Sequence, residues 1–369
     1  MKQISIYLEN ANLSPASYYR LTQYFQELPD TRIHSSLTDW IYLFWHRQSK
    51  YGRIVFAIPL YIIYFFRTLW FLIKDLRGIS NGIIIISRVL IPHKMLGLHK
   101  MLLTRLSKKN TIIWDYDDNI IESGSTCRSD FDYLSKACHY IVVTSPFLRD
   151  LVKVPYRDKV LLLPTTDGDM IETQYSQIGQ QRKDLYNNEI RLVWVATSSG
   201  LIHLNIIIKA LDDAARILKE KYKKELQLRI VCNKEATYTC HHLQMINIPW
   251  TRERAKSELK FAHIGIMPLI DNDFTRGKGG FKLVQYLSVY LPVIASAVGF
   301  NKEIITHDCG YLIDDQRQAE EGWKDAILSL STNWENYEVM CHSARQRYDE
   351  CFSYEKNKAF WLNLCQRMP

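Results

Sequence analysis

Several common signatures are missing from this chain of 369 residues. Its eight cysteines, scattered from Cys127 to Cys365, form no C-x-x-C pair. That spacing fits neither a disulfide framework nor a zinc site, so we expect reduced thiols and a cytoplasmic protein. We also expect no bound metal or cofactor. The opening residues MKQISIYLEN have the pattern of a first strand and not of a targeting segment. No internal repeat or low-complexity linker is evident.

Two familiar phosphate-binding motifs are also absent. The chain has no Walker loop G-x-x-x-x-G-K-[ST] and no Rossmann G-x-G-x-x-G, which argues against a P-loop enzyme and against a dinucleotide site. Acidic residues are in the minority, with 47 Lys and Arg against 39 Asp and Glu and a net charge of +8. This excess indicates anionic partners such as phosphates, nucleic acid or acidic lipid.

Short apolar runs alternate with helical patterns along the chain, which predicts parallel sheets with helices on both faces. The first series of runs is QISIYLE, NGIIIISRVL, NTIIWDYDDN, HYIVVTSPF and KVLLLPTTDGD. After the polar stretch QYSQIGQQRKDLYNNE the pattern restarts with the strand IRLVWVATSSG and a long helix, LIHLNIIIKALDDAARILKEKYKKE, followed by strands in LQLRIVCN, HIGIMPLI, LPVIASAVG and GYLIDD. We therefore predict an α/β protein of two doubly wound, Rossmann-like domains, residues 1–168 and 169–352, that face a cleft.

The stretch GKGGFK, residues 277–282, places Lys278 and Lys282 at the expected start of a helix. A helix N-terminus carries partial positive charge, so lysine there is unfavourable unless an anion binds. Glycines, free N–H groups and lysine charge together predict a phosphate site, with a solvated surface loop as the alternative. In VWVATSSG, hydroxyl residues end another strand and either cap the next helix or hold a phosphate; they are Thr197, Ser198 and Ser199.

The segment GKGGFKLVQYLSVYLPVIASAVGFNKEII resembles the donor-site segment of family 4 glycosyltransferases, a retaining family with the GT-B fold. IIWDYDDNI resembles a first-domain DxDD segment of one bacterial branch, and NIPWTRERAKSELKFAHIGIMPLID resembles the stretch before the donor site. The resemblance implies sugar transfer from a nucleotide-sugar to a glycan or lipid-linked acceptor in bacterial surface polysaccharide synthesis, without nucleic acid. It also implies that a final helix, residues 353–369, packs back on the first domain.

The resemblance implies roles for donor-site residues. Lys278 and Lys282 would stabilise the departing diphosphate without a metal. Gln285 would hold the ribose where many family members have glutamate, and Gln285→Glu should then be tolerated. The remaining donor-binding candidates are Thr197, Ser198, Ser199, Gly299, Asn301 and Glu303.

The chain departs from the family pattern. Gly277 stands where another glutamate usually contacts the sugar, and the arginine and lysine that often follow WVATSSG are missing. These departures leave two alternatives open: a glycosyltransferase-like scaffold without activity, and a nucleotide-sugar epimerase of the same fold.

Polar residues at strand ends of the first half are the acceptor-side candidates. Asp117 in WDYDDN is the catalytic candidate, because it could position an acceptor hydroxyl or stabilise an oxocarbenium-like centre; Asp115, Asp118 and Arg88 are its expected neighbours. The alternatives are an acidic helix-capping loop and a surface salt bridge. D-x-D triplets, which bind manganese in another glycosyltransferase fold, occur at Asp115–Asp117, Asp167–Asp169 and Asp271–Asp273, and we interpret them as chance.

The segment HRQSKYGRIVFAIPLYIIYFFRTLWFLIKDLR combines an apolar run with many basic residues. A spanning helix needs about 20 apolar residues and disfavours a central charge such as Arg67. An amphipathic helix on an anionic membrane surface tolerates this composition. We therefore expect peripheral contact with the inner face of a membrane, with a buried helix and a spanning helix as alternatives.

Overall fold

The computed structural model describes residues 2–170, 173–314 and 319–366. These residues form two compact units, each built on a parallel sheet with helices on both faces. One unit comprises residues 2–165, 277–279 and 355–366, and the other comprises residues 166–276 and 280–354 apart from the two undescribed gaps. The prediction of two Rossmann-like α/β domains is confirmed.

The first unit has six parallel strands in the order β2-β1-β3-β4-β5-β6. They are β1 (Ile4–Leu8), β2 (Thr31–Ser35), β3 (Ile83–Ser87), β4 (Thr111–Tyr116), β5 (Tyr140–Val143) and β6 (Val160–Leu162). The central strand β3 is buried along its whole length, as its run of isoleucines predicts for a strand covered on both faces. Its pairing with β1 sets Ile4 opposite Ile83.

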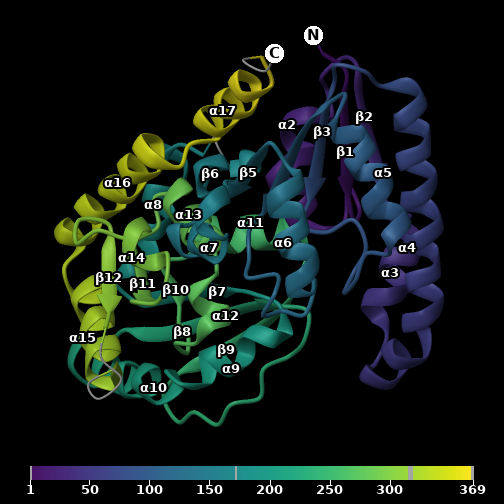
Figure 1. The fold of residues 1–369 in the computed structure, drawn as a ribbon. Helices are drawn as coiled ribbons and strands as arrows, with labels where there is room; N and C mark the ends of the chain where they lie inside the picture. The colour runs from purple at the N-terminus through teal and green to yellow at the C-terminus, as the bar shows by residue number, and fades with distance from the viewer. Residues whose placement is uncertain (1, 171–172, 315–318, 367–369) are drawn as a thin grey trace. The chain divides into compact units, whose positions relative to one another are not determined.

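Helices cover both faces of this first sheet (Figure 1). They are α1 (Pro15–Ser17), the π-helical η1 (Tyr18–Thr22), α2 (Gln23–Phe25), α3 (Asp39–Arg47), α4 (Lys50–Gly78), α5 (Gly97–Ser107), α6 (Arg128–Ala137), α7 (Pro146–Leu151), η2 (Val154–Lys159) and α17 (Tyr354–Gln366). The C-terminal helix α17 packs Trp361 edge-on against Phe25, with ring centroids 5.6 Å apart. Asn357 Nδ2 donates to the Pro164 carbonyl at 2.6 Å, so α17 is joined to the first unit by both apolar and polar contacts.

The second unit has six parallel strands in the order β12-β11-β10-β7-β8-β9. They are β7 (Glu189–Val195), β8 (Glu225–Cys232), β9 (Gln244–Pro249), β10 (Ile264–Met267), β11 (Val293–Ser296) and β12 (Gly310–Ile313). Its helices are η3 (Gly168–Met170), α8 (Tyr175–Tyr186), η4 (Ser198–Gly200), α9 (Leu201–Asn205), α10 (Ile208–Ile217), η5 (Leu218–Tyr222), α11 (Arg252–Phe261), α12 (Asp273–Arg276), α13 (Phe281–Ser288), α14 (Asn301–Ile304), α15 (Ala319–Thr332) and α16 (Trp334–Cys351). One apolar cluster joins α10 and α15 to the sheet, and a second joins α11 and α13 to it.

Four features of the fold differ from the sequence prediction. The edge strands β2 and β9 were not predicted, because they are only partly buried and mix polar with apolar residues. The predicted long helix is interrupted between α9 and α10, where a run of β-branched isoleucines follows Asn205 and lowers helix propensity. The polar stretch before β7 is a helix, α8, and its buried Arg182 donates to the carbonyls of Tyr290 and Val289.

Candidate functional site

The predicted donor-site residues share one edge of the second sheet. Thr197 follows β7, the GKGGFK loop follows β10 and α12, and Gly299 follows β11. The carboxyl ends of parallel strands meet at one edge of a sheet, which is where α/β proteins bind their ligands. His203 Nδ1 accepts a hydrogen bond from the Ile270 N–H at 3.2 Å and so ties the segment after β7 to the loop after β10.

Lys282 lies in the first turn of α13. The helix starts at Phe281 after Gly280, whose φ of 64° is left-handed. Lys278 lies in the loop just before, and both lysine side chains are half-buried. Two cations beside a helix N-terminus are the electrostatic arrangement expected for binding a diphosphate.

Gly299 is required by its surroundings. Its φ is 53°, and a Cβ at this position would lie 2.4 Å from the Arg276 carbonyl oxygen. A Cβ at Gly280 would similarly meet Ile304 Cδ1 at 2.2 Å, so the start of α13 closely approaches α14. The structure thus brings together Lys282, Gly299 and α14, three parts of the predicted donor site.

The other polar donor-site candidates differ in whether their polar groups are exposed or already hydrogen-bonded within the protein. Asn301 is buried and donates to the Ser296 carbonyl at 3.0 Å, so its side chain supports the loop after β11, whereas Glu303 is exposed. Thr197 and Ser199 hydrogen-bond each other through their hydroxyls at 2.9 Å. The Ser198 N–H already donates to Asn233 Oδ1 at 2.8 Å. Thr197, at the N-cap of η4, makes no side-chain capping hydrogen bond, so the contacts of the TSSG segment are with each other and with Asn233.

Gln285 lies one turn after Lys282 and has a partner that sequence reasoning missed. Its Nε2 donates to Asp167 Oδ2 at 2.6 Å. Asp167 is 1% exposed, and burial raises the pKa of its carboxyl while hydrogen bonds from Gln285 and from the Asp169 N–H oppose that rise. The sequence signal for this contact was the position of Asp167 in the polar segment after β6.

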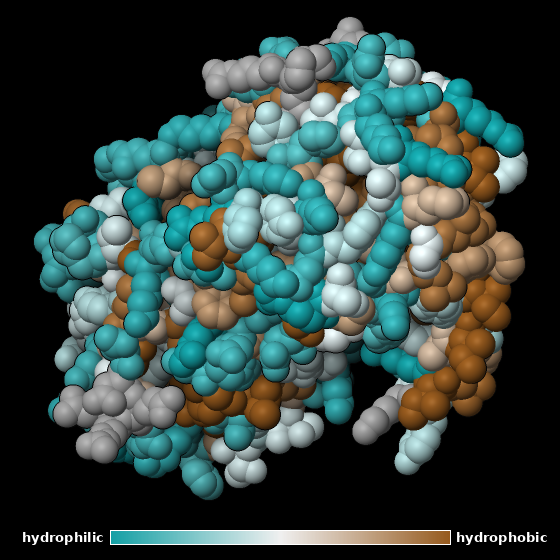
Figure 2. All heavy atoms as spheres, viewed as in Figure 1, coloured by the Kyte–Doolittle hydropathy of each residue, from teal (hydrophilic) through white to brown (hydrophobic). Residues whose placement is uncertain are grey.

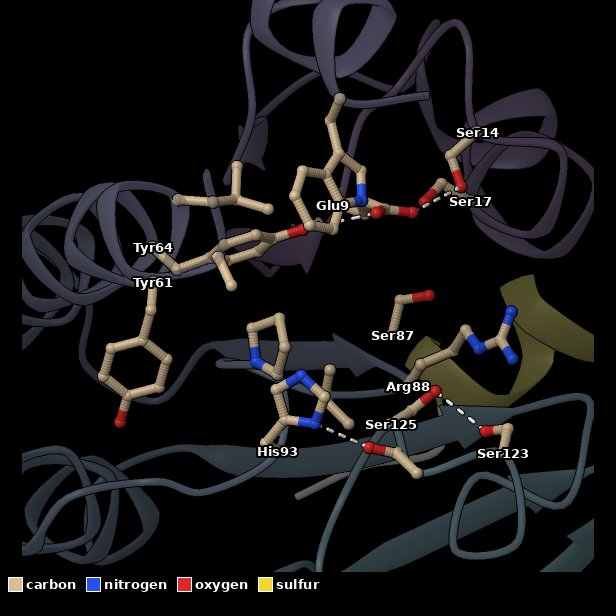
Figure 3. A pocket seen from close by; sticks show the side chains of 16 residues that line it. Glu9, Ser14, Ser17, Tyr61, Tyr64, Ser87, Arg88, His93, Ser123 and Ser125 are labelled. Atoms are coloured by element: carbon tan, nitrogen blue, oxygen red, sulfur yellow. Dashed lines mark hydrogen bonds between the residues drawn. The ribbon is translucent and has the colours of Figure 1, made fainter. Parts of the chain in front are cut away.

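The first unit contains a pocket of about 310 Å³ at the carboxyl edge of its own sheet. Loops after β1 and β3 and the inward face of α4 supply most of its lining, which includes Glu9, Ser14, Ser17, Tyr61, Tyr64, Ser87, Arg88, His93, Ser123 and Ser125. Figure 3 shows Glu9 with Ser14 and Ser17 on one side of the pocket and His93, Ser123 and Ser125 on the other. Such a mixture of hydroxyl, carboxylate and cationic groups suits a hydroxylated ligand.

Glu9 is the main pocket residue that sequence reasoning missed. Its carboxylate accepts hydrogen bonds from Tyr64 and Ser14, each at 3.3 Å. The Tyr64 phenol has its pKa raised well above the usual value by burial and by this carboxylate, so it stays protonated and donates. Glu9 directly follows β1, and this strand-end position is the signal that could have identified it.

Arg88 joins the pocket to the acidic strand-end residues. It has φ of 55° and pairs with Asp118 at 3.3 Å and with Asp117 at 3.7 Å. Asp117 and Asp118 remain partly exposed, with 19% and 28% of their side chains accessible. The structure therefore brings Arg88, Asp117 and Asp118 together as expected.

Asp115 is placed differently from these three residues. It is fully buried and forms an ion pair with the buried Arg20, whose Nη1 also donates to the Leu163 carbonyl at 2.5 Å. Because β4 alternates its side chains between faces, Asp115 points inward while Asp117 lies beyond the strand end. The geometry gives Asp115 an internal supporting role and removes it from direct contact with an acceptor.

The D-x-D carboxylates mostly have protein partners. Asp115 pairs with Arg20, Asp167 accepts from Gln285, and Asp169 lies 3.1 Å from Lys256 Nζ. Arg276 pairs with both acidic residues of the third triplet, Asp271 and Asp273. These pairings give the acidic residues structural roles in the protein itself.

The helices α3 and α4 carry an exposed apolar surface. A row of α4 side chains at four-residue spacing is accessible, comprising Ile54, Ile58, Ile62, Phe66 and Trp70, and Trp40 on α3 is 73% exposed. Figure 2 shows hydrophobic residues gathered along this side of the first unit. We call this set the α3–α4 apolar surface. The alternative of a buried helix does not hold for the whole of α4, because only the inward stripe through Tyr64, Thr68, Leu72 and Asp75 is buried.

Within the described ranges, Tyr51–Gly78 is the single helix whose length and hydropathy would suffice for a membrane span. Length and composition alone are weak evidence for a span. The same helix packs against α5 and buries Asp75 in the first unit.

Comparisons with known proteins agree with this architecture. Residues 197–333 match the family model described as "Glycosyl transferases group 1". The structure of Anabaena HepE in complex with UDP and glucose is similar, with a TM-score of 0.67 and 10% identity over 100% of both chains. A glycosyltransferase from Rickettsia africae has a TM-score of 0.62 at 11% identity, covering 100% of this chain and 98% of that one.

A third similar structure is the sucrose-phosphate synthase of Thermosynechococcus elongatus. It has a TM-score of 0.56 and 14% identity, and the match covers 84% of this chain and 78% of that one. No curated protein sequence matches the chain. The chain therefore has the two-domain GT-B fold of these structures, and residues 197–333 are similar to the glycosyl transferases group 1 family.

Proposed function

We propose that this protein is a retaining glycosyltransferase that moves a sugar from a nucleotide-sugar to a glycan or lipid-linked acceptor in bacterial surface polysaccharide synthesis. The observation that carries the proposal is that Lys282, Gln285 and Gly299 lie at the carboxyl edge of the second sheet, with Lys278 in the loop just before α13. All four fall inside the segment that matches glycosyl transferases group 1. Complexes of HepE with UDP and with UDP-glucose are consistent with this assignment.

The proposed chemistry uses the two units for different substrates. The nucleoside diphosphate lies against the N-terminus of α13, where Lys278 and Lys282 stabilise the negative charge that grows as the sugar–phosphate bond breaks. The acceptor oxygen forms the new bond to the anomeric carbon, and its proton passes to the departing diphosphate. In this account fixed lysine charges take the place of a metal ion.

The pocket of the first unit is the proposed acceptor site. Glu9, Arg88 and the surrounding hydroxyls would bind a polar headgroup, and Asp117 would orient the attacking hydroxyl. Asp118 shares Arg88 with Asp117 and so helps to fix it. Asp115 supports this edge of the sheet through its pair with Arg20.

A nucleotide-sugar panel tests the function. The protein should release a nucleoside diphosphate from at least one of the common UDP-, GDP- or ADP-sugars, and the matching diphosphate should raise the melting temperature by mass action on the native state. Interconversion of donor sugars without release would favour an epimerase. Binding without turnover of any donor would favour an inactive scaffold, and no melting shift at millimolar diphosphate would contradict the whole assignment.

We also propose that the α3–α4 apolar surface binds an anionic membrane, which would place the protein on the cytoplasmic face. Exposed basic residues flank this surface, with Arg47 and Arg53 near one end and Lys74 and Arg77 near the other. Apolar side chains bordered by cations match the interfacial region of a bilayer that contains acidic lipid. The burial of Thr68, Leu72 and Asp75 in the first unit favours surface contact over a spanning helix.

A further inference from the structure

The contact between Gln285 and Asp167 has a fixed direction. Gln285 Nε2 is the donor, and Asp167 Oδ2 accepts at 2.6 Å. The other carboxylate oxygen, Oδ1, accepts from the backbone N–H of Asp169 at 2.8 Å. A backbone N–H only donates, so Oδ1 must be an acceptor, and an ionised carboxylate presents an acceptor at Oδ2 as well. This arrangement holds the amide nitrogen of Gln285 against Asp167.

The orientation of the amide determines what Gln285 offers to a ligand. A glutamine amide has one donor group and one acceptor oxygen. Asp167 takes one of the two N–H donors on Nε2, and Oε1 is the acceptor that the amide has left for a ligand. In the ranges that the structure describes, Oε1 has no hydrogen-bond partner. Gln285 therefore presents an acceptor, as a carboxylate would, but without the charge.

We propose that Asp167 is a positioning residue that fixes the Gln285 amide so that its oxygen accepts a hydrogen bond from a ribose hydroxyl of the nucleotide donor. The inference rests on the proposed function, because it takes Gln285 as the ribose-binding residue. It adds a residue, Asp167, that lies outside the segment matched by the family model. It also makes the residues at positions 167 and 285 interdependent.

This interdependence reverses an expectation from the sequence. Gln285→Glu would restore the commoner family residue, but it would set two carboxylates at the distance of a hydrogen bond. Asp167 is buried, so neither charge would be well solvated, and one group would have to take up a proton. Adding Asp167→Asn should relieve the conflict. The amide introduced at position 167 would then donate to the carboxylate introduced at position 285, while its oxygen still accepts from the Asp169 N–H.

Melting curves without ligand test the pair itself. At pH 8, Gln285→Glu should lower the melting temperature by about 3–6 °C, the scale of 1–2 kcal/mol in a domain of this size. The double variant Gln285→Glu with Asp167→Asn should recover most of that loss, and Gln285→Glu alone should recover as the pH falls toward 5. The proposed direction of the hydrogen bond, from Gln285 to Asp167, is wrong in either of two cases. One is that Gln285→Glu melts like the wild type at pH 8, and the other is that adding Asp167→Asn does not restore its melting temperature.

Nucleotide binding tests the role of the pair. We would measure the dissociation constants of UDP and of its 2′-deoxy and 3′-deoxy analogues, or of the GDP series if GDP binds more tightly. Loss of the contacted hydroxyl should weaken binding to the wild type about fivefold, the scale of one neutral hydrogen bond. Gln285→Ala should lose this discrimination, and so should Asp167→Ala.

The outcomes separate the inference from the proposed function. Failure of the wild type to bind any nucleoside diphosphate would contradict the proposed function. The melting experiment needs no ligand, so it would still test the hydrogen bond between Gln285 and Asp167. If Asp167→Ala remains folded and keeps the wild-type ratio between ribose and deoxyribose nucleotides, Asp167 does not position Gln285. Retained discrimination in Gln285→Ala would show that another residue contacts the ribose.

Discussion

At the scale of single residues, the two polar side chains of α13 should affect catalysis differently. Lys282 and Gln285 lie three residues apart and share one face of the helix. The proposed ribose contact of Gln285 is equally strong in the ground state and in the transition state. The proposed phosphate contact of Lys282 strengthens as charge builds on the leaving group. Only the second kind of contact raises turnover.

We therefore predict that Lys282→Ala lowers turnover about 10²–10³-fold, as the loss of a preorganised transition-state donor does. Steady-state kinetics with saturating donor would measure the effect, and melting curves would confirm that the variant is folded. Lys221→Ala is the matched control, because Lys221 is an exposed lysine of the same unit at the end of η5. Near-normal turnover in a folded Lys282→Ala protein would contradict the assignment of the phosphate site to GKGGFK.

At the scale of elements, α4 combines a buried stripe with an exposed one. Asp75 on its inward face is fully buried and accepts hydrogen bonds from Ser5, from the Tyr7 hydroxyl at 2.6 Å and from His34 at 3.2 Å. Burial alone would raise the pKa of Asp75, but the bonds from His34, Ser5 and Tyr7 outweigh burial and lower it. The network therefore anchors α4 to β1 and β2.

Asp75→Asn should destabilise the protein by about 1.5–3 kcal/mol at pH 7, the scale of hydrogen bonds to a charged group. A carboxyl with a lowered folded-state pKa contributes stability above its unfolded pKa of about 3.9 and loses it as the pH falls through the folded value. The difference between wild type and variant should therefore shrink at pH values below about 4. Denaturant titrations at pH 7, 5 and 3.5 would measure it, with the exposed neighbour change Lys74→Gln as control. Equal stabilities at pH 7 would contradict the anchoring role.

The exposed stripe of α4 supports a membrane-binding prediction. The protein should float with liposomes that contain acidic lipid and much less with neutral ones, because apolar insertion and charge attraction act together. Ile54→Glu with Ile58→Glu should abolish flotation. Val339→Glu is the control, since Val339 is an equally exposed apolar residue of the second unit.

The lipid dependence also separates a membrane from a protein partner. Removing cations through Arg47→Gln with Arg53→Gln should reduce the preference for acidic lipid. Equal recovery with both kinds of liposome, or none with either, would contradict the prediction. A dimer in solution that the Ile54→Glu, Ile58→Glu variant converts to a monomer, without any flotation, would assign the α3–α4 apolar surface to a second copy of the chain.

At the scale of the whole molecule, the proposed mechanism places fixed positive charge at the donor site of one unit and the acceptor in the other. Lys282 and the start of α13 supply that charge in the second unit, and Lys278 adds to it from the loop just before the helix. The acidic triplets, by contrast, are paired with Arg20, Gln285 and Arg276. The proposed mechanism therefore uses groups that the chain itself provides.

Sugar transfer should accordingly survive chelation. Release of nucleoside diphosphate from the active donor should stay within about twofold of its starting rate in excess EDTA, because lysine charge and helix N–H groups perform the electrostatic stabilisation. The assay would compare untreated, EDTA-treated and manganese-supplemented protein. Complete loss in EDTA with recovery on adding manganese would show that a D-x-D triplet binds the metal.

The sequence by itself determined much of the architecture. Buried strands such as β3 and β7 are apolar and β-branched along their length, and that pattern arises from burial on both faces of a sheet. Strand-end positions also located Arg88, Asp117 and the GKGGFK loop, because the carboxyl ends of parallel strands share an edge. The edge strands β2 and β9 carry a weaker pattern, since one side of each lacks a neighbouring strand.

Only the tertiary structure decided which polar residues form ion pairs and hydrogen bonds with each other. Asp115 and Asp117 are two residues apart in one acidic motif, yet one is buried with Arg20 and the other reaches the strand end. Asp167 and Gln285 are separated by 118 positions in the chain, and their contact arises because the segment after β6 folds against α13. A local sequence pattern does not predict contacts between residues that are so far apart in the chain. The orientation of the Gln285 amide, and with it the group offered to a ligand, therefore follows from the fold.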